Sequence, residues 1–540
     1  MIQNRQGFKK KLKLIVKNTV FNFVHKIAIQ QLKKIVKNSS PPPKTKKGGK
    51  KIIFNLIYGM YGYLIYWESG FAKAMQLRGH DVKVLICGKS LTMCTSEYTI
   101  QTVHDDKTCK HCVDFTQDFL KTMGLPHLNI KDYISDEEIL KIKEKVNKMT
   151  LEECKNFVYK NVPVGGFSIN AVTRYFEGAI DIDEKLYESV LRAELINSLI
   201  VIDAAEKIIQ EEKPDIVFTT HLGYSSWGSF ADYCEINGIR VTYPGDGYKK
   251  YTIQFDMPLK EKVNIFFKEF RKYRNDEPLN KKEDDELNLF IYKRIHGKEG
   301  DTSRYHFQNE DVRDQFDLKK YDRTFAIFPN VVWDSSLLRA NKAFKDAYEW
   351  ISDTIEFFKN HPNYQLILKI HPSEIYAAKS KNTLLDYIFK NYSPLSDNIK
   401  IVPPVTNISP YSLFSIIDTG IVYNGTLGLE MALHNVPVIV AGITHYNDFG
   451  FTYDVSSKEN YYELLSQKLP KLNEEQIKLA KLYGYFYFIK SYVPYKFLYS
   501  ESFLKKGYNI KSFDELKEGK DKILDKICDY IANNKFYQKW

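Results

Sequence analysis

Short apolar runs alternate with helical patterns along most of the chain, and this alternation predicts an α/β fold. Residues 51–57 and 82–87 are apolar segments on either side of a helical stretch at 71–77. The same order of strand, helix and strand recurs within residues 420–440. Because parallel strands need a crossover connection, usually a helix, we expect parallel sheets.

The pattern divides the chain into five parts. Residues 275–321 are dense in charge and short of apolar side chains, so we place the connection between two α/β domains there. We expect the parts to be a basic helix with a Pro/Lys/Gly linker, a first domain, the connection, a second domain and a set of C-terminal helices, at 1–50, 51–274, 275–321, 322–490 and 491–540.

A small-residue turn follows the apolar run at 420–423. It contains Asn424, Gly425 and Thr426, and a helix begins after it. Ligands bind parallel sheets at the carboxyl ends of the strands, and the N–H groups of a new helix favour an anion. Glu430 lies about one turn into that helix, where a carboxylate would repel a phosphate but can accept hydrogen bonds from sugar hydroxyls. Alternatively, Glu430 only complements the helix dipole.

Two other strand ends carry candidate chemistry. Asp246 stands between Gly245 and Gly247 after the apolar run at 239–243, which is where a catalytic carboxylate of an open sheet would lie. The alternative is a turn aspartate that bonds its own backbone. His371 follows the apolar run at 365–370, and an imidazole there can hydrogen-bond a phosphate oxygen, although a histidine at a strand end is often structural.

The formal charge of +11 is concentrated near the N-terminus. Residues 1–51 contain Arg5 and fourteen lysines and no acidic residue. Subtracting these fifteen from the 78 basic residues leaves 63 basic against 67 acidic residues, so the globular part is not basic. This argues against a general nucleic-acid-binding protein.

Residues 8–37 place apolar side chains on one helical face and most lysines elsewhere. Such a helix can lie in the surface of an anionic membrane, so we predict that residues 1–37 contact one. The alternative is a helix docked on the protein with its lysines in water. The prolines, lysines and glycines at 39–51 predict a linker.

The seven cysteines are an odd number in a long chain. We see no cleavable signal peptide and no apolar run of the ~20 residues that span a bilayer, so we expect a reducing, cytoplasmic setting. A weak candidate for a structural zinc site consists of Cys87, Cys94, Cys109 and Cys112, with His111 as a substitute ligand. Ordinary thiols are the default interpretation.

Three motifs occur in series in the second half of the chain: FPNVVWDSS at 328–336, LILKIHPSE at 366–374 and YNGTLGLEMALHNVPVIVAG at 423–442. With them the chain resembles the capsule polysaccharide biosynthesis family of bacterial glycosyltransferases. The resemblance covers most of 320–455, and it is more diffuse over 51–250.

The resemblance implies the GT-B architecture, in which two Rossmann-like domains face each other across a cleft and the second holds the nucleotide sugar. The first would be the acceptor domain. His371 and Pro372 match the motif that contacts the donor phosphate, and the phosphate- and ribose-binding turn and helix are matched by Asn424, Gly425, Thr426 and Glu430.

Relatives that use CMP-sugars also carry an acid-acid-Gly motif whose carboxylate deprotonates the acceptor. Here Gly245-Asp246-Gly247 keeps the Asp-Gly but lacks the first acid, which leaves the donor nucleotide open between CMP and UDP. Glycosyl transfer needs a base and positive partners for the leaving phosphate. Asp246 would be the base, and Lys369, His371 and the helix start near Thr426 would be the partners.

We therefore expect a metal-independent glycosyltransferase that needs no cofactor. It would act on a lipid-linked saccharide acceptor of a surface or capsular polysaccharide, at the inner face of the cytoplasmic membrane, without binding nucleic acid. One alternative is a polyol-phosphate transferase or a nucleotide-sugar 2-epimerase, which have similar paired domains. Another is a non-catalytic, membrane-associated partner of a capsule assembly complex.

Overall fold

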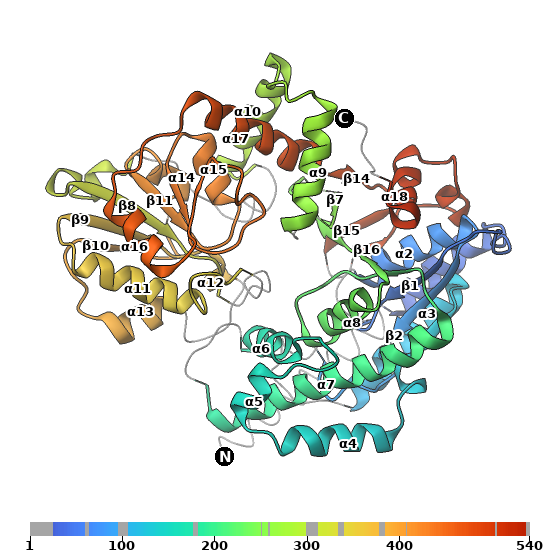
Figure 1. Ribbon diagram of the computed structural model, residues 1–540. Coiled ribbons are helices and arrows are strands. Elements are labelled where there is room, and N and C mark those ends of the chain that lie inside the picture. The colour runs from blue at the N-terminus through green and yellow to red at the C-terminus, as the bar shows by residue number, and fades with distance from the viewer. Residues whose placement is uncertain are drawn as a thin grey trace. The chain divides into compact units, whose positions relative to one another are not determined.

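The computed structural model divides the chain into two compact units (Figure 1). The first consists of Met1–Val172, Tyr187–Tyr243 and Pro494–Tyr537; the second consists mainly of Pro244–Val493. The residues that the structure describes are 25–59, 64–94, 106–176, 182–249, 251–256, 260–298, 311–332, 340–376, 384–406, 408–502 and 505–535.

The first unit is built on a five-stranded parallel sheet in the order β3-β2-β1-β4-β5. Its strands are β1 (Lys51–Asn55), β2 (Asp81–Ile86), β3 (His127–Asn129), β4 (Ile216–Phe218) and β5 (Arg240–Thr242). Its main helices are α2 (Leu64–Leu77), α3 (Asp106–Met123), α4 (Asp136–Asn147), α5 (Leu151–Asn156), α6 (Val164–Tyr175), α7 (Glu184–Glu212), α8 (Ser225–Ile236) and α18 (Lys522–Asn533).

The C-terminal segment belongs to the first unit. It contains the hairpin β15 (Leu498–Ser502) and β16 (Lys505–Tyr508) and the short helix η8 (Phe513–Leu516) before α18. Phe497 packs edge-on against Phe71 of α2, with ring centroids 5.3 Å apart. Arg78 forms an ion pair of 2.5 Å with Asp525. These contacts hold the C-terminal segment, including α18, in the unit that contains the N-terminal part of the chain.

The second unit is built on a six-stranded parallel sheet in the order β10-β9-β8-β11-β12-β13. In both units the chain starts in the middle of the sheet and reverses direction after three strands, which is the Rossmann-like order. The predicted fold class, α/β with two Rossmann-like domains, is confirmed. The strands are β8 (Arg323–Phe328), β9 (Tyr364–Lys369), β10 (Ile399–Val402), β11 (Thr419–Val422), β12 (Val438–Val440) and β13 (Tyr453–Asp454).

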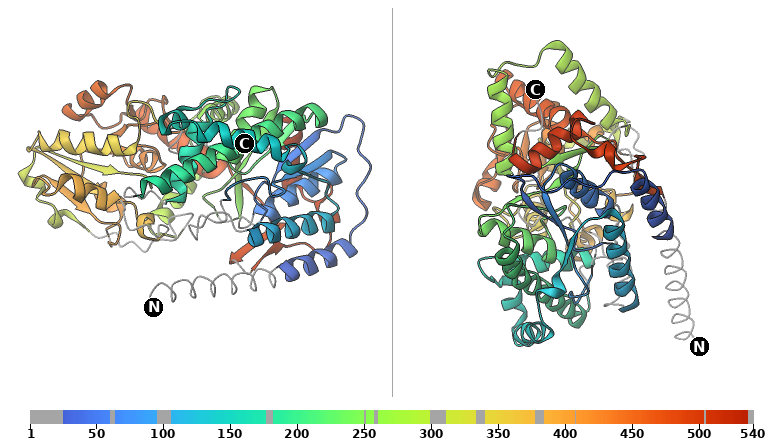
Figure 2. Two further views of the ribbon diagram at one scale, coloured as in Figure 1. Left: turned by 90° about the horizontal axis from the view of Figure 1, so that it is seen from below. Right: turned by 90° about the vertical axis from the view of Figure 1, so that its right-hand side faces the viewer.

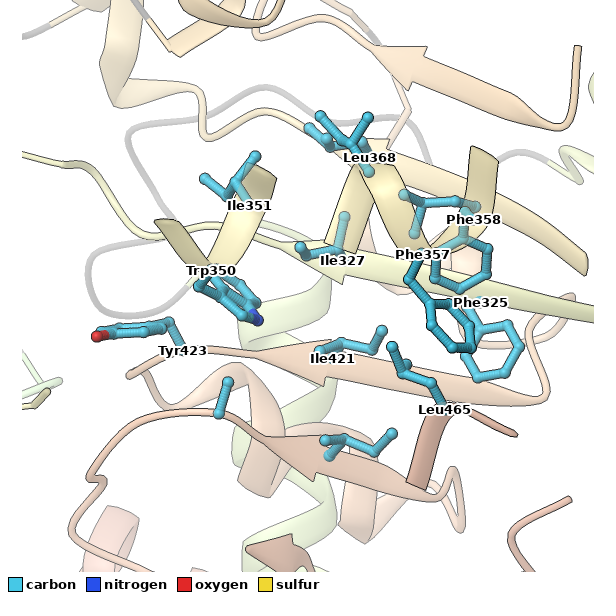
Figure 3. Close-up of a cluster of buried hydrophobic side chains, with 14 of the residues drawn as sticks. Phe325, Ile327, Trp350, Ile351, Phe357, Phe358, Leu368, Ile421, Tyr423 and Leu465 are labelled. Atoms are coloured by element: carbon cyan, nitrogen blue, oxygen red, sulfur yellow. The ribbon is translucent and has the colours of Figure 1, made fainter. Parts of the chain in front are cut away.

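Helices of the second unit pack on its sheet and around one another. They are α9 (Lys260–Tyr273), α10 (Lys281–Ile295), α11 (Ala347–Lys359), α12 (Ser373–Tyr376), α13 (Leu384–Tyr392), α14 (Pro410–Leu413), α15 (Leu427–Leu433), α16 (Lys458–Ser466), α17 (Glu474–Tyr485) and the π-helix η7 (Phe486–Lys490). Figure 3 shows the core on one face, where Trp350 and Phe358 of α11 and Leu465 of α16 lie against Ile327 and Ile421 of the strands. Near-continuous burial of these strands is expected when both faces of a parallel sheet are covered.

Residues 244–298 cluster with the second unit, although we expected the first domain to run to 274 and a connection to follow. The reason lies in the apolar faces of α9 and α10. Phe267 of α9 packs against Phe486 at a centroid distance of 5.3 Å, and Phe290 of α10 packs against Phe488 at 5.4 Å. A helix needs only one stripe of apolar side chains to pack against its neighbours, so a segment rich in charge can still be buried on one side.

Residues 25–37 form the described part of the N-terminal helix (Figure 2). Ala28, Leu32 and Ile35 are buried, and the ring of His25 stacks on Phe115 of α3 at 3.7 Å. Over these residues the docked-helix alternative is therefore correct, and the lysines are exposed. The rest of the predicted membrane-binding helix, residues 1–24, lies outside the described residues. No helix in the described part of the chain combines the length and apolarity needed to cross a bilayer.

Candidate functional site

The predicted turn lies at the carboxyl edge of the second sheet, between β11 and α15. The N–H of Asn424 donates to Oδ1 of Asn330, which follows the neighbouring strand β8, at 3.1 Å. The hydroxyl of Tyr446 donates to the carbonyl of Gly425. A side chain at Gly428 would collide with that same tyrosine hydroxyl. The turn is thus held from two sides, and only glycine fits at 428.

Glu430 is buried within this site and has two protein partners. Its Oε1 lies 2.9 Å from Nη2 of Arg294, and the two side chains are 1% and 3% exposed. Its Oε2 accepts a hydrogen bond from the hydroxyl of Tyr411, which belongs to α14. The carboxylate therefore does more than complement the dipole of a seven-residue helix, because it fixes α15 to α10 and α14.

Arg294 also connects Glu430 to the hairpin that carries Asp246. The hairpin consists of β6 (Pro244–Asp246) and β7 (Thr252–Phe255). The ring of Tyr248, two residues after Asp246, lies 4.7 Å from the Arg294 guanidinium, a cation–π contact. From β7, Nε2 of Gln254 donates to Oγ of Ser491 at 2.6 Å.

The hairpin thus belongs to the same unit as the predicted donor site. The backbone of Asp246 in β6 pairs with that of Ile253 in β7, but the Asp246 side chain lies outside the described part of the chain.

Lys369, His371 and Pro372 follow one another at the end of β9. Burial lowers the pKa of Lys369 to about 8, and its Nζ donates to the carbonyls of Ile370 and Pro403, each at 3.2 Å. Nδ1 of His371 accepts from the N–H of Ser373 at 3.1 Å, so a neutral ring carries its proton on Nε2. Pro372 is buried. Strand β8 separates β9 from β11, so His371 and Asn424 lie at one edge of the sheet.

Several residues at this edge were not found from the sequence. Arg294 lies in the charged segment that we expected to be a connection between domains, and Tyr248 and Tyr411 belong to none of the motifs. His445 follows β12, and burial lowers its pKa to about 3. Its ring stacks on Tyr487 at 3.9 Å, and its Nδ1 lies 2.7 Å from the Tyr483 hydroxyl. Its place just after a strand of the sheet was the one available signal.

Glu374 is another buried carboxyl group near the end of β9. Burial raises its pKa, and its Oε2 accepts from the N–H of Leu384 at 2.9 Å. The last four residues of the motif FPNVVWDSS, which follow Val332, lie outside the described residues.

The four cysteines of the zinc candidate are all described. Cys109 and Cys112 lie on α3, Cys87 follows β2, and all seven cysteines of the chain are thiols. Across the described residues, no three His, Cys, Asp or Glu side chains are grouped as a metal site would require. The structure does not assemble this ligand set.

Comparison with known proteins agrees with the motifs. Residues 253–492 match the family model described as "Capsule polysaccharide biosynthesis protein". A comparison with curated proteins found no match.

Solved structures with similarity to the chain include two KpsC enzymes of Thermosulfurimonas dismutans and a UDP-GlcNAc 2-epimerase. The beta Kdo 2,7 transferase is 14% identical over 59% of this chain and 90% of its own, with a TM-score of 0.32. The beta Kdo 2,4 transferase is 12% identical over 58% of this chain and 93% of its own, with a TM-score of 0.34. The epimerase from Neisseria meningitidis, bound to UDP-GlcNAc, is 12% identical over 81% of this chain and 96% of its own, with a TM-score of 0.24. The resemblance to the capsule polysaccharide biosynthesis family is confirmed over residues 253–492, the segment that holds the predicted donor site.

Proposed function

We propose that this protein is a glycosyltransferase that moves a sugar from a nucleotide-sugar donor to a surface or capsular polysaccharide. The observation that carries the proposal is the family match over 253–492. That segment contains His371, the turn at 424–426 and Glu430, all at the carboxyl edge of one parallel sheet. Ligands of such sheets bind at this edge.

The leaving nucleotide carries a phosphate whose charge grows as the glycosidic bond breaks. In our proposal His371 donates its Nε2 proton in a hydrogen bond to a phosphate oxygen, and backbone N–H groups near Thr426 add to it. Lys369 contributes positive charge from behind the strand end. Donors that are held in place before the reaction stabilise developing charge most effectively.

Glu430 would bind the ribose of the donor. A carboxylate has about four lone-pair sites, and the contacts with Arg294 and Tyr411 use one on each oxygen. A rigid carboxylate with remaining lone pairs can accept hydrogen bonds from ribose hydroxyls. The ion pair would then orient Glu430 for this role.

Asp246 would be the base. It would accept the proton of the acceptor hydroxyl while that oxygen bonds to the anomeric carbon, and the bond from that carbon to the phosphate oxygen breaks, with its electron pair leaving on the nucleotide. We infer a CMP- or UDP-linked donor, and an acceptor that is lipid-linked. The lysine-rich residues 1–24 would hold the protein on the anionic inner face of the cytoplasmic membrane.

The first experiment is a thermal-shift panel of CMP-, UDP-, GDP- and CDP-linked compounds, because a bound ligand raises the melting temperature by mass action. We expect one nucleotide to stand out, and the shift to disappear in His371→Ala but persist in Lys141→Ala, an exposed position on α4. A transfer assay with that donor follows. Release of an epimerised sugar nucleotide would favour the epimerase alternative, and silence across the panel would contradict the proposal and favour a non-catalytic role.

A further inference from the structure

Most of the N-terminal lysines lie in a segment that is docked on the first unit. Nine of the fourteen lysines of residues 1–51 belong to residues 25–51, and this segment contains no Asp, Glu or Arg. Figure 2 shows its helix, residues 25–37, in dark blue on the outside of the first unit. The first unit therefore carries a dense positive charge at a defined place on its surface.

Protein contacts fix this segment along its length. The helix is held by the buried apolar face described above. Just after the helix, the N–H of Phe513 donates to Oγ of Ser39 at 2.8 Å. In the linker, the N–H of Lys46 donates to the carbonyl of Gly79 at 2.9 Å. Since protein already covers the apolar face, a partner that approaches the helix from outside meets its polar face.

The polar face of the helix is a stripe of lysines. Successive residues of a helix are about 100° apart around its axis. Four exposed lysines therefore fall within a sector of about 100° opposite the buried face, and we call them the lysine face: Lys26, Lys33, Lys34 and Lys37. Three more exposed lysines follow in the linker: Lys44, Lys46 and Lys47. Within the described part of the chain none of these seven forms an ion pair, whereas Lys50 lies 3.9 Å from Asp215.

The residue types of the segment indicate the kind of partner. Proteins that bind nucleic acid commonly use arginines that contact bases and aromatic rings that stack on them. Residues 25–51 contain no Arg, Phe, Tyr or Trp. A row of lysines on one side of a rigid helix instead fits the headgroup phosphates of an anionic bilayer, which are spread over a surface and need charge rather than a fixed geometry.

We propose that the lysine face binds the anionic surface of a lipid bilayer while the helix stays docked on α3. The first unit then rests on the membrane in one orientation, with the docked helix between the bilayer and α3. Because the apolar face is not available to lipid, the attraction is electrostatic and salt weakens it. The choice of a bilayer rests on the proposed function, which places the protein at a membrane but assigns the contact to residues 1–24.

The test uses the full-length protein and flotation with vesicles of equal parts phosphatidylglycerol and phosphatidylcholine. The lysine-face variant carries Lys26→Gln, Lys33→Gln, Lys34→Gln and Lys37→Gln. The control variant loses the same charge at exposed positions elsewhere: Lys141→Gln, Lys148→Gln, Lys468→Gln and Lys471→Gln. A lysine near an anionic membrane strengthens binding roughly fivefold, so we expect the lysine-face variant to bind at least about tenfold more weakly and the control to bind like wild type. Equal loss in both variants, or no loss in the lysine-face variant, would overturn the proposal.

A depth measurement tests the orientation. Gln30 is exposed in the same sector as the lysine face, so the fluorescence of Gln30→Trp should be quenched by lipids brominated near the headgroup. Ile236, which is 49% exposed on α8, is the matched control, because α8 covers the opposite face of the sheet from α3. Quenching of Ile236→Trp but not of Gln30→Trp would overturn the proposed orientation. Vesicle binding that high salt does not reverse would indicate apolar insertion and would also overturn the proposal.

A separate variant distinguishes this result from the proposed function. Lys9→Gln, Lys10→Gln, Lys11→Gln and Lys13→Gln together test the membrane role of residues 1–24. Loss of vesicle binding in that variant alone would overturn the role of the lysine face, and loss in the lysine-face variant alone would contradict only the role of residues 1–24. The nucleotide thermal shift should persist in both variants, so it tests the donor site independently. Salt-sensitive binding of double-stranded DNA without any vesicle binding would overturn the choice of a bilayer.

Discussion

Arg294 and Glu430 are 136 residues apart in the sequence, and their side chains form a 2.9 Å ion pair that is almost inaccessible to water. Transfer of two charges from water to a protein interior costs several kcal/mol per ion before their attraction offsets it. Such a pair adds little net stability compared with apolar residues of the same size. Its value is that it holds α10, α15 and the Tyr248 hairpin in one arrangement.

Replacement of either Arg294 or Glu430 alone should lower the free energy of unfolding much more than replacement of both by apolar residues. We expect Arg294→Met to lower the free energy of unfolding by about 3–5 kcal/mol, because it leaves Glu430 charged and buried. Arg294→Met combined with Glu430→Leu should recover most of that loss. Denaturant unfolding of the single and double variants measures both, and a double variant as unstable as the single one would show that the pair matters through packing alone.

If Glu430 binds the ribose, the double variant should recover stability without recovering donor binding. Glu430→Gln, which preserves the shape of the side chain, should weaken donor binding about tenfold by calorimetry, since a hydrogen bond to a charged group contributes ~1.5–3 kcal/mol. Tyr411→Phe is the matched control, because it removes a contact to Glu430 but leaves its charge. Unchanged affinity in Glu430→Gln would assign the residue to structure only.

Asp246→Asn should abolish transfer, because an amide cannot accept the acceptor proton, while the nucleotide thermal shift remains. Rates of transfer and of donor hydrolysis measure this. Asp203→Asn, in α7 of the first unit, is the control. Transfer that survives in Asp246→Asn at the wild-type rate would exclude this base.

Lys369 should make the folding stability depend on alkaline pH. Its pKa is lowered from 10.5 to about 8 in the folded state, so between these values the unfolded chain binds more protons and stability rises with pH. The rise is on the order of 3 kcal/mol. Lys73 is a second lysine whose pKa burial lowers to about 8, so it contributes a similar rise of its own. Lys369→Met and Lys73→Met should therefore each lose about half of the total rise, and the double variant should lose all of it. Identical pH profiles for wild type and Lys369→Met would contradict this.

The two parts of the N-terminal helix should behave differently on deletion. Removal of residues 1–24 should reduce flotation with anionic liposomes and leave the melting temperature unchanged. Removal of residues 1–37 should also destabilise the first unit, because Leu32 and Ile35 pack against it. Liposomes without anionic lipids are the control. Full retention of anionic binding after the shorter deletion would refute the membrane role.

Local patterns were enough to predict the sheets and the turn at 424–426, because strand, turn and helix there are encoded within thirty residues. The partners of Glu430 could not be predicted, since Arg294 comes from a charged helix far away in the sequence. The helix at 25–37 shows the same limit. An amphipathic pattern predicts that the apolar face of the helix is covered, but it does not predict whether protein or lipid covers it.

The return of the C-terminal segment to the first unit makes the second unit an insertion within the first. Among the described residues, the second unit is one continuous stretch, Pro244–Val493, apart from Thr173–Leu186, whereas the first unit needs both sides of that stretch. On the ribosome, the second unit can therefore mature while the first still waits for α18. Two cuts release Pro244–Val493, which is most of the second unit, but the first unit needs a new covalent link from Tyr243 to Pro494.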